Sequence, residues 1–131
     1  MQTRRRAQGF TLVELLLVIA IIGILAAYLI PNVIAAQRKA YDAGAIACGK
    51  SLQTAEYLNQ IDSQTYFVPS KVVTDTALSG LPPGIEVNTG CNGPDMVITN
   101  GVADQTSFAF LISDTRGNRT FTFTPTALEA H

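Results

Sequence analysis

The chain has 131 residues and a formal net charge of −1, which is enough for one small globular domain and an appendage. Three of its nine basic residues stand at positions 4–6, and from position 10 onward carboxylates outnumber basic side chains. This balance argues against the basic footprint of a nucleic-acid-binding protein. The single histidine, His131, excludes sites built on several histidines.

A nearly uninterrupted apolar run extends from Phe10 to Ile30 and contains one carboxylate, Glu14. Because each helical residue advances about 1.5 Å, the run is about 31 Å long and matches the hydrocarbon core of a membrane. The preceding arginines place that end in the cytoplasm and the rest of the chain on the other side. An ordinary signal peptide would be shorter, and a plain anchor would leave Glu14 without the partner that a charge in a membrane needs.

The helical pattern continues beyond the apolar run. Pro31 lacks a backbone donor and Gly23 lies two turns earlier, so the stretch between them is predicted to be the weakest part of the helix. Residues 33–60 form an amphipathic half that ends at about Asn59, and its buried stripe packs against a globular head. The residues of the stripe are Ile34, Tyr41, Ala45, Cys48, Leu52, Ala55 and Leu58.

Residues 61–131 are predicted to form the head, beginning with a loop region that contains one helical turn near Asp75 to Leu78. Asn100-Gly101 and Arg116-Gly117-Asn118 are predicted turns. The fold class is therefore α+β, with a long N-terminal helix packed on a four-stranded antiparallel sheet. Its strands are expected at Ile85–Asn88, Asp95–Thr99, Ser107–Ser113 and Arg119–Thr124, the third of them central because both of its faces are apolar.

The two cysteines, Cys48 and Cys91, lie in the exported part of the chain, where a disulfide persists. Two cysteines allow a single intramolecular pairing, so we predict a Cys48–Cys91 disulfide. The alternative is a pair of separate buried thiols.

No catalytic or metal-binding group can be assembled from the sequence, and we expect neither an enzyme nor a cofactor. Asp95 with Asn92 and Asn100 offers oxygen ligands for calcium, although turn formation explains these residues better. Asn118 begins a glycosylation sequon that also forms a turn. A nucleic-acid-binding head is weakly indicated, because Lys71 is isolated and only Arg116 and Arg119 flank a turn near Phe121.

The segment Gly9-Phe10-Thr11-Leu12-Val13-Glu14, followed by an apolar helix and Pro31, resembles the class III signal and N-terminal helix of type IV pilins and pseudopilins. The resemblance covers about thirty contiguous residues, whereas the rest of the chain matches only in the order of its elements. It implies the pilin fold. It also implies that residues 1–9 are a leader, which prepilin peptidase removes by cutting between Gly9 and Phe10 before methylating the new amine of Phe10.

The same resemblance gives Glu14 a role. Residues 10–32 would first cross the membrane and then enter a filament core, where Glu14 neutralises the Phe10 amine of a neighbouring subunit. The stretch from Gly23 to Pro31 would kink in the free subunit and lose helical structure in the fibre. The alternative for Glu14 is a carboxylate that is tolerated near a helix start because the helix dipole favours it.

The function implied is that of a structural pilus subunit. It would be held in the inner membrane with its N-terminus in the cytoplasm and polymerised into a surface filament for motility, adhesion or DNA uptake. Implied partners are other copies of the chain, prepilin peptidase, the inner-membrane assembly machinery, the outer-membrane secretin and, before assembly, membrane lipid. Nucleic acid is not indicated as a partner.

Two alternatives belong to the same family. One is a pseudopilin of a type II secretion system, although the major pseudopilins usually carry a calcium loop near the C-terminus that the short stretch Ser113–Asn118 does not match. The other is a minor or DNA-binding pilin.

Overall fold

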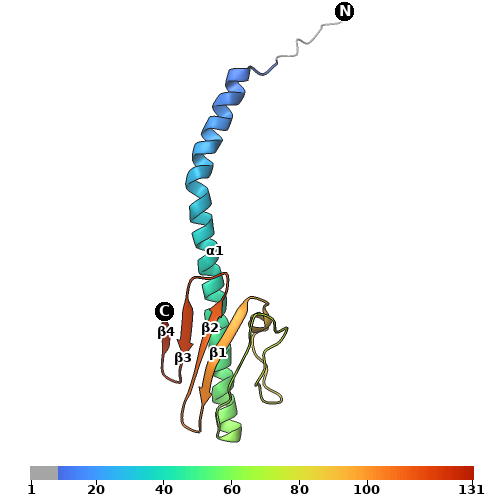
Figure 1. The fold of residues 1–131 in the computed structure, drawn as a ribbon, viewed down its shortest axis with the longest axis vertical. Helices are drawn as coiled ribbons and strands as arrows, with labels where there is room; N and C mark the ends of the chain where they lie inside the picture. Colours follow the sequence, from blue (N-terminus) through green and yellow to red (C-terminus); the bar gives the residue numbers. More distant parts are fainter. Residues whose placement is uncertain (1–8) are drawn as a thin grey trace, which may run out of the picture. The chain divides into compact units, whose positions relative to one another are not determined.

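The computed structural model describes residues 9–131, except for the side chain of Asn100, as one long helix, one short 3-10 helix and one antiparallel sheet (Figure 1). The chain divides into two compact units, Met1–Ala35 and Ala36–His131, which are described separately below. Helix α1, Leu12–Ser63, contributes its first part to unit 1 and its second part to unit 2.

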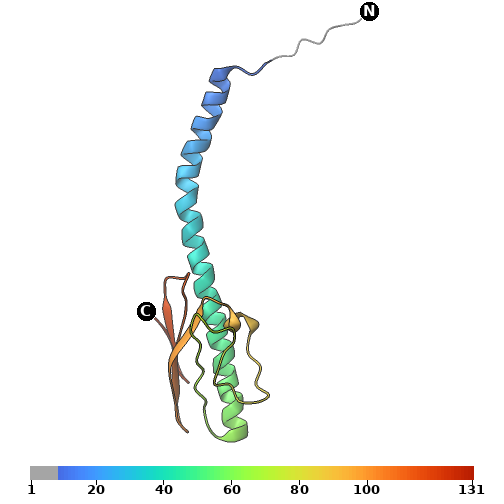
Figure 2. The ribbon, with the colours of Figure 1, turned by 45° about the vertical axis from the view of Figure 1, so that its right-hand side comes forward.

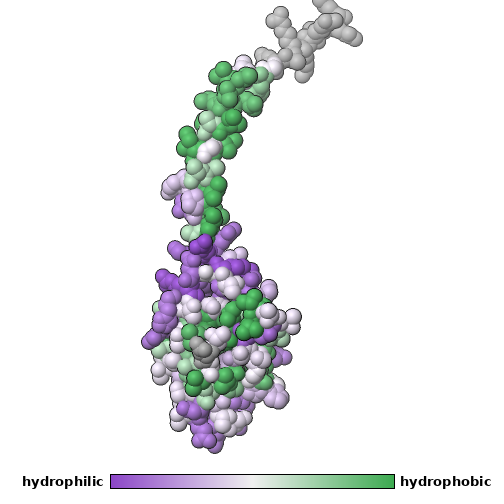
Figure 3. Space-filling view, in the orientation of Figure 1, coloured by the Kyte–Doolittle hydropathy of each residue, from purple (hydrophilic) through white to green (hydrophobic). Residues whose placement is uncertain are grey.

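The part of α1 in unit 1 presents apolar side chains to the outside on all sides, and Figure 3 shows it mostly in the hydrophobic colour. By length and composition this helix qualifies to cross a membrane. The helix runs through Gly23 and Pro31 without a break in its assignment. The predicted loss of helical structure in a fibre stays a prediction.

In unit 2, one face of α1 is buried against the sheet, as the views in Figures 1 and 2 both show. Four members of the predicted stripe are buried: Ala45, Cys48, Leu52 and Ala55. Ile34 and Leu58 are exposed, and the prediction was wrong for both. Near Leu58 the buried face turns to Glu56 and Asn59 instead. The helix ends at Ser63, four residues later than expected, and Gln64 follows it in the left-handed conformation typical of a helix C-terminus.

The sheet contains four antiparallel strands in the order β1-β2-β3-β4. Their bounds are β1, Met96–Ala103; β2, Phe108–Asp114; β3, Thr120–Phe123; and β4, Leu128–Ala130. The predicted fold class is therefore confirmed, and β2 is a central strand as expected. Its alternate residues are fully buried, and the rings of Phe110 and Phe123 on the neighbouring strand stack with centroids 5.5 Å apart.

Two predictions about the sheet were wrong. Ile85–Asn88 is not a strand, because this segment lies in the loop before the 3-10 helix η1, Thr89–Asn92. The fourth strand is β4, which pairs with β3 at the C-terminal end of the chain. The predicted helical turn at Asp75 to Leu78 is also absent from the described structure, where these residues form an irregular loop.

Asn100-Gly101 does not make a turn. It lies inside β1, where the register with β2 shifts between Thr99 and Val102 as in a β-bulge. A side chain at Gly101 would collide with Val68, whose segment continues into a backbone pairing between Lys71 and Ile98 at the edge of β1. The true β1–β2 connection is Asp104–Ser107, where the Asp104 carboxylate accepts hydrogen bonds from the following backbone.

Candidate functional site

Gly9, Phe10 and Glu14 lie at the start of α1: the first two residues precede the helix, and Glu14 stands in its first turn. Gly9 and Phe10 precede the helix and are exposed, with the Phe10 side chain 84% accessible. The peptide bond between them is therefore not protected by helical hydrogen bonding. Such a bond is open to a protease, as predicted leader cleavage requires. The basic residues at positions 4–6 lie outside the described residues.

Glu14 closes a capping box with Thr11. The Thr11 backbone nitrogen and hydroxyl donate to Glu14 Oε2 at 2.9 and 2.7 Å, and the Glu14 backbone nitrogen donates to Thr11 Oγ1 at 3.3 Å. These bonds satisfy donors that a helix start otherwise leaves free. The sequence analysis missed this role, although the Thr-x-x-Glu spacing before an apolar run is its signature.

The disulfide prediction is confirmed. Cys48 on α1 and Cys91 in η1 are bonded, at a sequence separation of 43, and both side chains are buried. The bond joins the loop that precedes the sheet to the helix beneath it. This loop has little regular structure of its own, and it is also joined to α1 by the bond from the Asn88 nitrogen to Ser51 Oγ at 2.8 Å.

Asp42 fastens the β2–β3 turn to α1. Its Oδ1 atom accepts hydrogen bonds from the backbone nitrogens of Asn118 and Arg119 at 2.9 and 3.2 Å. A side chain at Gly117 would collide with this carboxylate, so the close approach requires glycine. The predicted turn at Arg116-Gly117-Asn118 is confirmed, and the Asn118 side chain accepts a bond from Arg38 Nη1 at 3.2 Å.

Arg116 is held in place by neighbouring side chains. It donates to both oxygens of Asp114 at 3.0 and 2.8 Å, pairs with Asp95 at 3.2 Å and lies over the Tyr41 ring, 4.2 Å from its centroid. The Arg116 hydrogen bonds hold the pKa of Asp114 below its ordinary value against the effect of desolvation. Asp114 in turn raises the pKa of Arg116.

Besides Asp42, two charged side chains are buried in unit 2 without an ion-pair partner among the described residues. Lys71 Nζ donates to the carbonyl oxygens of Asp75 and Met96 at 3.0 and 3.3 Å. Glu56 Oε2 accepts from the Phe67 backbone nitrogen at 2.9 Å, whereas Oε1 has no partner. Desolvation raises the pKa of Glu56 to about 7, opposed in part by the bond from Phe67.

The alternative sites considered from the sequence are not assembled. For the calcium site considered from the sequence, Asp95 and Asn92 would have to serve as oxygen ligands. In the structure Asp95 forms a salt bridge with Arg116, and Asn92 Oδ1 accepts a hydrogen bond from the Leu78 nitrogen, so both side chains already have protein partners. Within residues 9–131, no group of three or more His, Cys, Asp or Glu side chains is placed to hold a metal ion. Phe121 is buried and Lys71 is enclosed, so they form no exposed aromatic and basic patch.

Comparison with known proteins gives matches that include the N-terminal helix. Residues 4–30 match the family described as the prokaryotic N-terminal methylation motif. Over 81 residues the chain is 41% identical to the type IV wide pilus major component PilA4 of Thermus thermophilus, a match that covers 62% of each chain. Over 51 residues it is 51% identical to the type IV major pilin protein PilA of Myxococcus xanthus, covering 39% of this chain and 23% of that relative.

A third relative comes from a secretion system. The chain is 33% identical over 66 residues to the type II secretion system core protein G of Vibrio cholerae, covering 50% of this chain and 45% of the relative. Each of these matches spans less than two thirds of the relative's own length. The methylation motif, the helix packed on an antiparallel sheet and these relatives together support the resemblance to type IV pilins with a class III signal.

Proposed function

We propose that the chain is the structural subunit of a type IV pilus. The observation that carries the proposal is the surface of α1 in unit 1, where large apolar side chains are exposed on every side of the helix. Such a surface is stable only in lipid or against other apolar helices. A subunit stored in the inner membrane and later packed into a filament meets these two environments in turn.

Processing prepares the helix for this transfer. Prepilin peptidase removes residues 1–9 and methylates the new amine of Phe10, and Glu14 of one subunit then pairs with the Phe10 amine of the next. The four-residue spacing of Phe10 and Glu14 is about one helical turn, which suits a pair between staggered neighbours. In a low-dielectric core an unpaired carboxylate is strongly unfavourable, so the pair selects the correct axial register. The segment from Gly23 to Pro31 loses helical structure as the heads pack.

The filament functions at the cell surface, in motility, adhesion or DNA uptake. Its assembly requires the inner-membrane machinery and the outer-membrane secretin. A pseudopilin of a type II secretion system is the second candidate, supported by the similarity to core protein G. The pilus is favoured because the match to PilA4 is longer and because Asp114, in the segment where a calcium loop would lie, is already bound by Arg116.

Electron microscopy and mass spectrometry of sheared surface fibres test the proposal. Fibres should contain this chain beginning at methylated Phe10 and should be absent from a strain that lacks it. The Glu14→Val variant should be inserted and cleaved normally but left out of fibres. Normal fibres from a strain without the chain would refute the pilus assignment, and normal fibres made of Glu14→Val would refute the role of Glu14.

A further inference from the structure

A groove of about 330 Å³ lies between α1 and the β2–β3 turn of unit 2. Ile46 and Phe121 provide its apolar floor, and Lys39 and Arg119 stand on its rim with exposed side chains. An apolar floor with a cationic rim suits a carboxylate carried on a short side chain, because the chain carbons and the charge both find partners.

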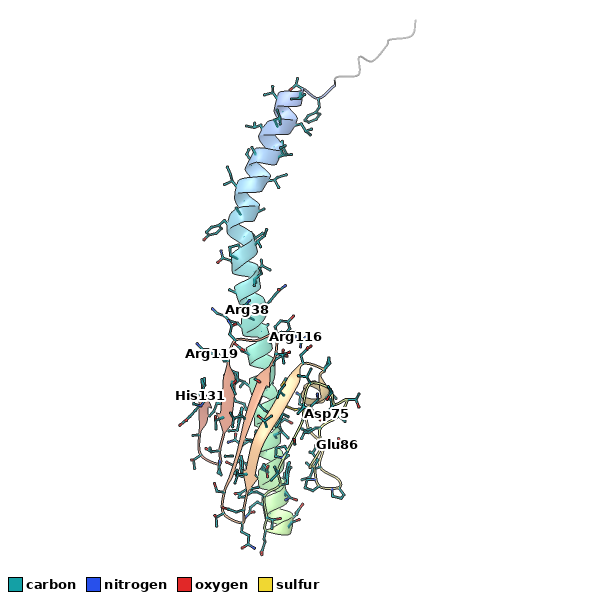
Figure 4. All side chains as sticks on the ribbon, in the orientation of Figure 1. Arg38, Asp75, Glu86, Arg116, Arg119 and His131 are labelled. Atoms are coloured by element: carbon teal, nitrogen blue, oxygen red, sulfur yellow. A yellow bond between two sulfur atoms is a disulfide. The ribbon has the colours of Figure 1, made fainter. Side chains whose placement is uncertain are left out.

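The positive charge of this groove is only partly balanced by unit 2. Asp42 also lines the groove, and its carboxylate, whose Oδ1 atom accepts bonds from the backbone nitrogens of Asn118 and Arg119, offsets one of the two rim cations. One positive charge remains. Neither rim side chain forms a salt bridge within the described residues, and Arg38 beside them contacts only the neutral Asn118. Figure 4 shows Arg38 and Arg119 at the same end of the sheet.

The opposite end of unit 2 carries exposed carboxylates. Gln60, near the end of α1, donates a hydrogen bond to the carbonyl oxygen of Gln105 in the β1–β2 turn at 3.2 Å. The C-terminal end of α1 and the β1–β2 turn therefore lie side by side. Asp62 follows on the helix and Asp104 precedes on the turn, both exposed and neither in a salt bridge within residues 9–131. Asp104 Oδ1 accepts bonds from the backbone of its own turn, which come from neutral donors and leave the negative charge of the carboxylate in place. Because β2 runs from this turn to the β2–β3 turn, the two charged ends are separated by the length of the strand.

We propose that the basic groove of one copy of this chain binds the acidic end, Asp62 and Asp104, of a second copy. The inference rests on the proposed function and deepens it. When copies stack in one direction along a fibre, one end of each copy meets the other end of the next copy. In that arrangement the basic groove of one copy faces the acidic end of its neighbour, and the two charges attract. Two basic ends repel each other, which disfavours the inverted arrangement and fixes the orientation of the heads.

A charge exchange in the full-length chain tests this contact. Lys39→Glu with Arg119→Glu reverses the groove, and Asp62→Lys reverses part of the acidic end. Each alone should lower the amount of sheared fibre by about tenfold, because like charges then face each other. The combination of all three substitutions should restore most of the fibre. Wild-type fibres should also dissociate more readily in high salt, because exposed charge pairs are screened.

The controls use exposed charges elsewhere in unit 2. Lys50→Glu on the helix changes the charge by −2, half the change in the groove double variant, and Glu129→Lys on β4 changes it by +2, as Asp62→Lys does. Both should leave assembly intact. Immunoblots of membrane fractions verify that all variants are inserted to wild-type levels. The backbone bond from residue 119 to Asp42 is retained in Arg119→Glu, so the β2–β3 turn is preserved.

The outcomes separate the two proposals. If wild-type cells make no fibres of this chain, the proposed function fails and this contact with it. If wild-type fibres form and the reversed variants assemble equally well, only the contact is refuted. Loss of fibre on groove reversal without restoration by Asp62→Lys also refutes the contact.

Discussion

The carboxylate of Glu14 and the backbone nitrogen of Thr11 are joined by a hydrogen bond of 2.9 Å at the first turn of α1. Together with the reciprocal bond to the Thr11 hydroxyl, this contact stabilises the helix start within a single chain. Glu14 therefore has a local partner before any neighbouring subunit arrives. If Glu14 pairs with the Phe10 amine of a neighbouring subunit in a filament, its carboxylate must either give up the hydrogen bond from Thr11 or accept both bonds at once.

The two roles of Glu14 can be separated by comparing Glu14→Gln with Glu14→Val. Glutamine keeps an acceptor for the capping box but carries no charge, whereas valine loses both. If the charge pair drives assembly, both variants should fail to enter fibres, and only Glu14→Val should also lose helicity at the N-terminus. Amide exchange at residues 11–14 in detergent, with fibre yields, measures both effects. If Glu14→Gln entered fibres as well as the wild type, the charge of Glu14 would not be needed for assembly, and capping of the helix start would be its only role.

Replacing Cys48 and Cys91 together by serine should destabilise unit 2. The disulfide closes a loop spanning 43 positions, for which the chain-entropy account gives about 4 kcal/mol. Denaturant unfolding of the detergent-solubilised chain measures the loss, and reductant should lower the stability of wild type but not of the variant. Equal midpoints for oxidised and reduced wild type would contradict the prediction.

Two helix glycines should respond in opposite ways to alanine. A methyl group at Gly49 collides with the Phe123 ring, so Gly49→Ala should destabilise unit 2 by about 1–3 kcal/mol. At Gly44 the same methyl group meets open space, so Gly44→Ala should be neutral or stabilise the helix by up to about 1 kcal/mol. Thermal unfolding of both variants provides the comparison. A similar cost at both positions would argue against close packing of helix and sheet at Gly49.

Glu56 should make the stability of unit 2 depend on pH. Its pKa is raised from 4.5 to about 7 on folding, so the folded state holds this proton more tightly than the unfolded state. The resulting stabilisation is complete below about pH 4.5 and is lost as pH rises through about 7. In wild type the free energy of unfolding should fall by roughly 2–3 kcal/mol over this pH range. Glu56→Gln resembles the protonated form of the side chain and should remove this fall.

Unfolding at a series of pH values measures the Glu56 effect, and Glu86→Gln at an exposed position is the matched control. The control should keep the pH dependence of wild type. An unchanged slope in Glu56→Gln would show that another group is responsible.

The sequence by itself determined the features that depend on local chemistry. A long apolar run with one carboxylate at its start, a proline at its end and a single pair of cysteines sufficed to predict the helix, the resemblance to pilins and the disulfide. The alternating aromatic residues of β2 also predicted a buried central strand. The helix and the central strand could be predicted because each depends on residues that are close in the sequence. The disulfide could be predicted because two cysteines allow only one pairing.

Only the tertiary structure decided the features in which distant segments compete. Asn100-Gly101 has the composition of a turn, but the chain at Val68 packs against Gly101 and the pair becomes a bulge within β1. The three-residue strand β4 is too short to have its own pattern and forms by pairing with β3. The separation of charge between the two ends of unit 2 also arises from topology, because it depends on which turn lies beside which end of α1.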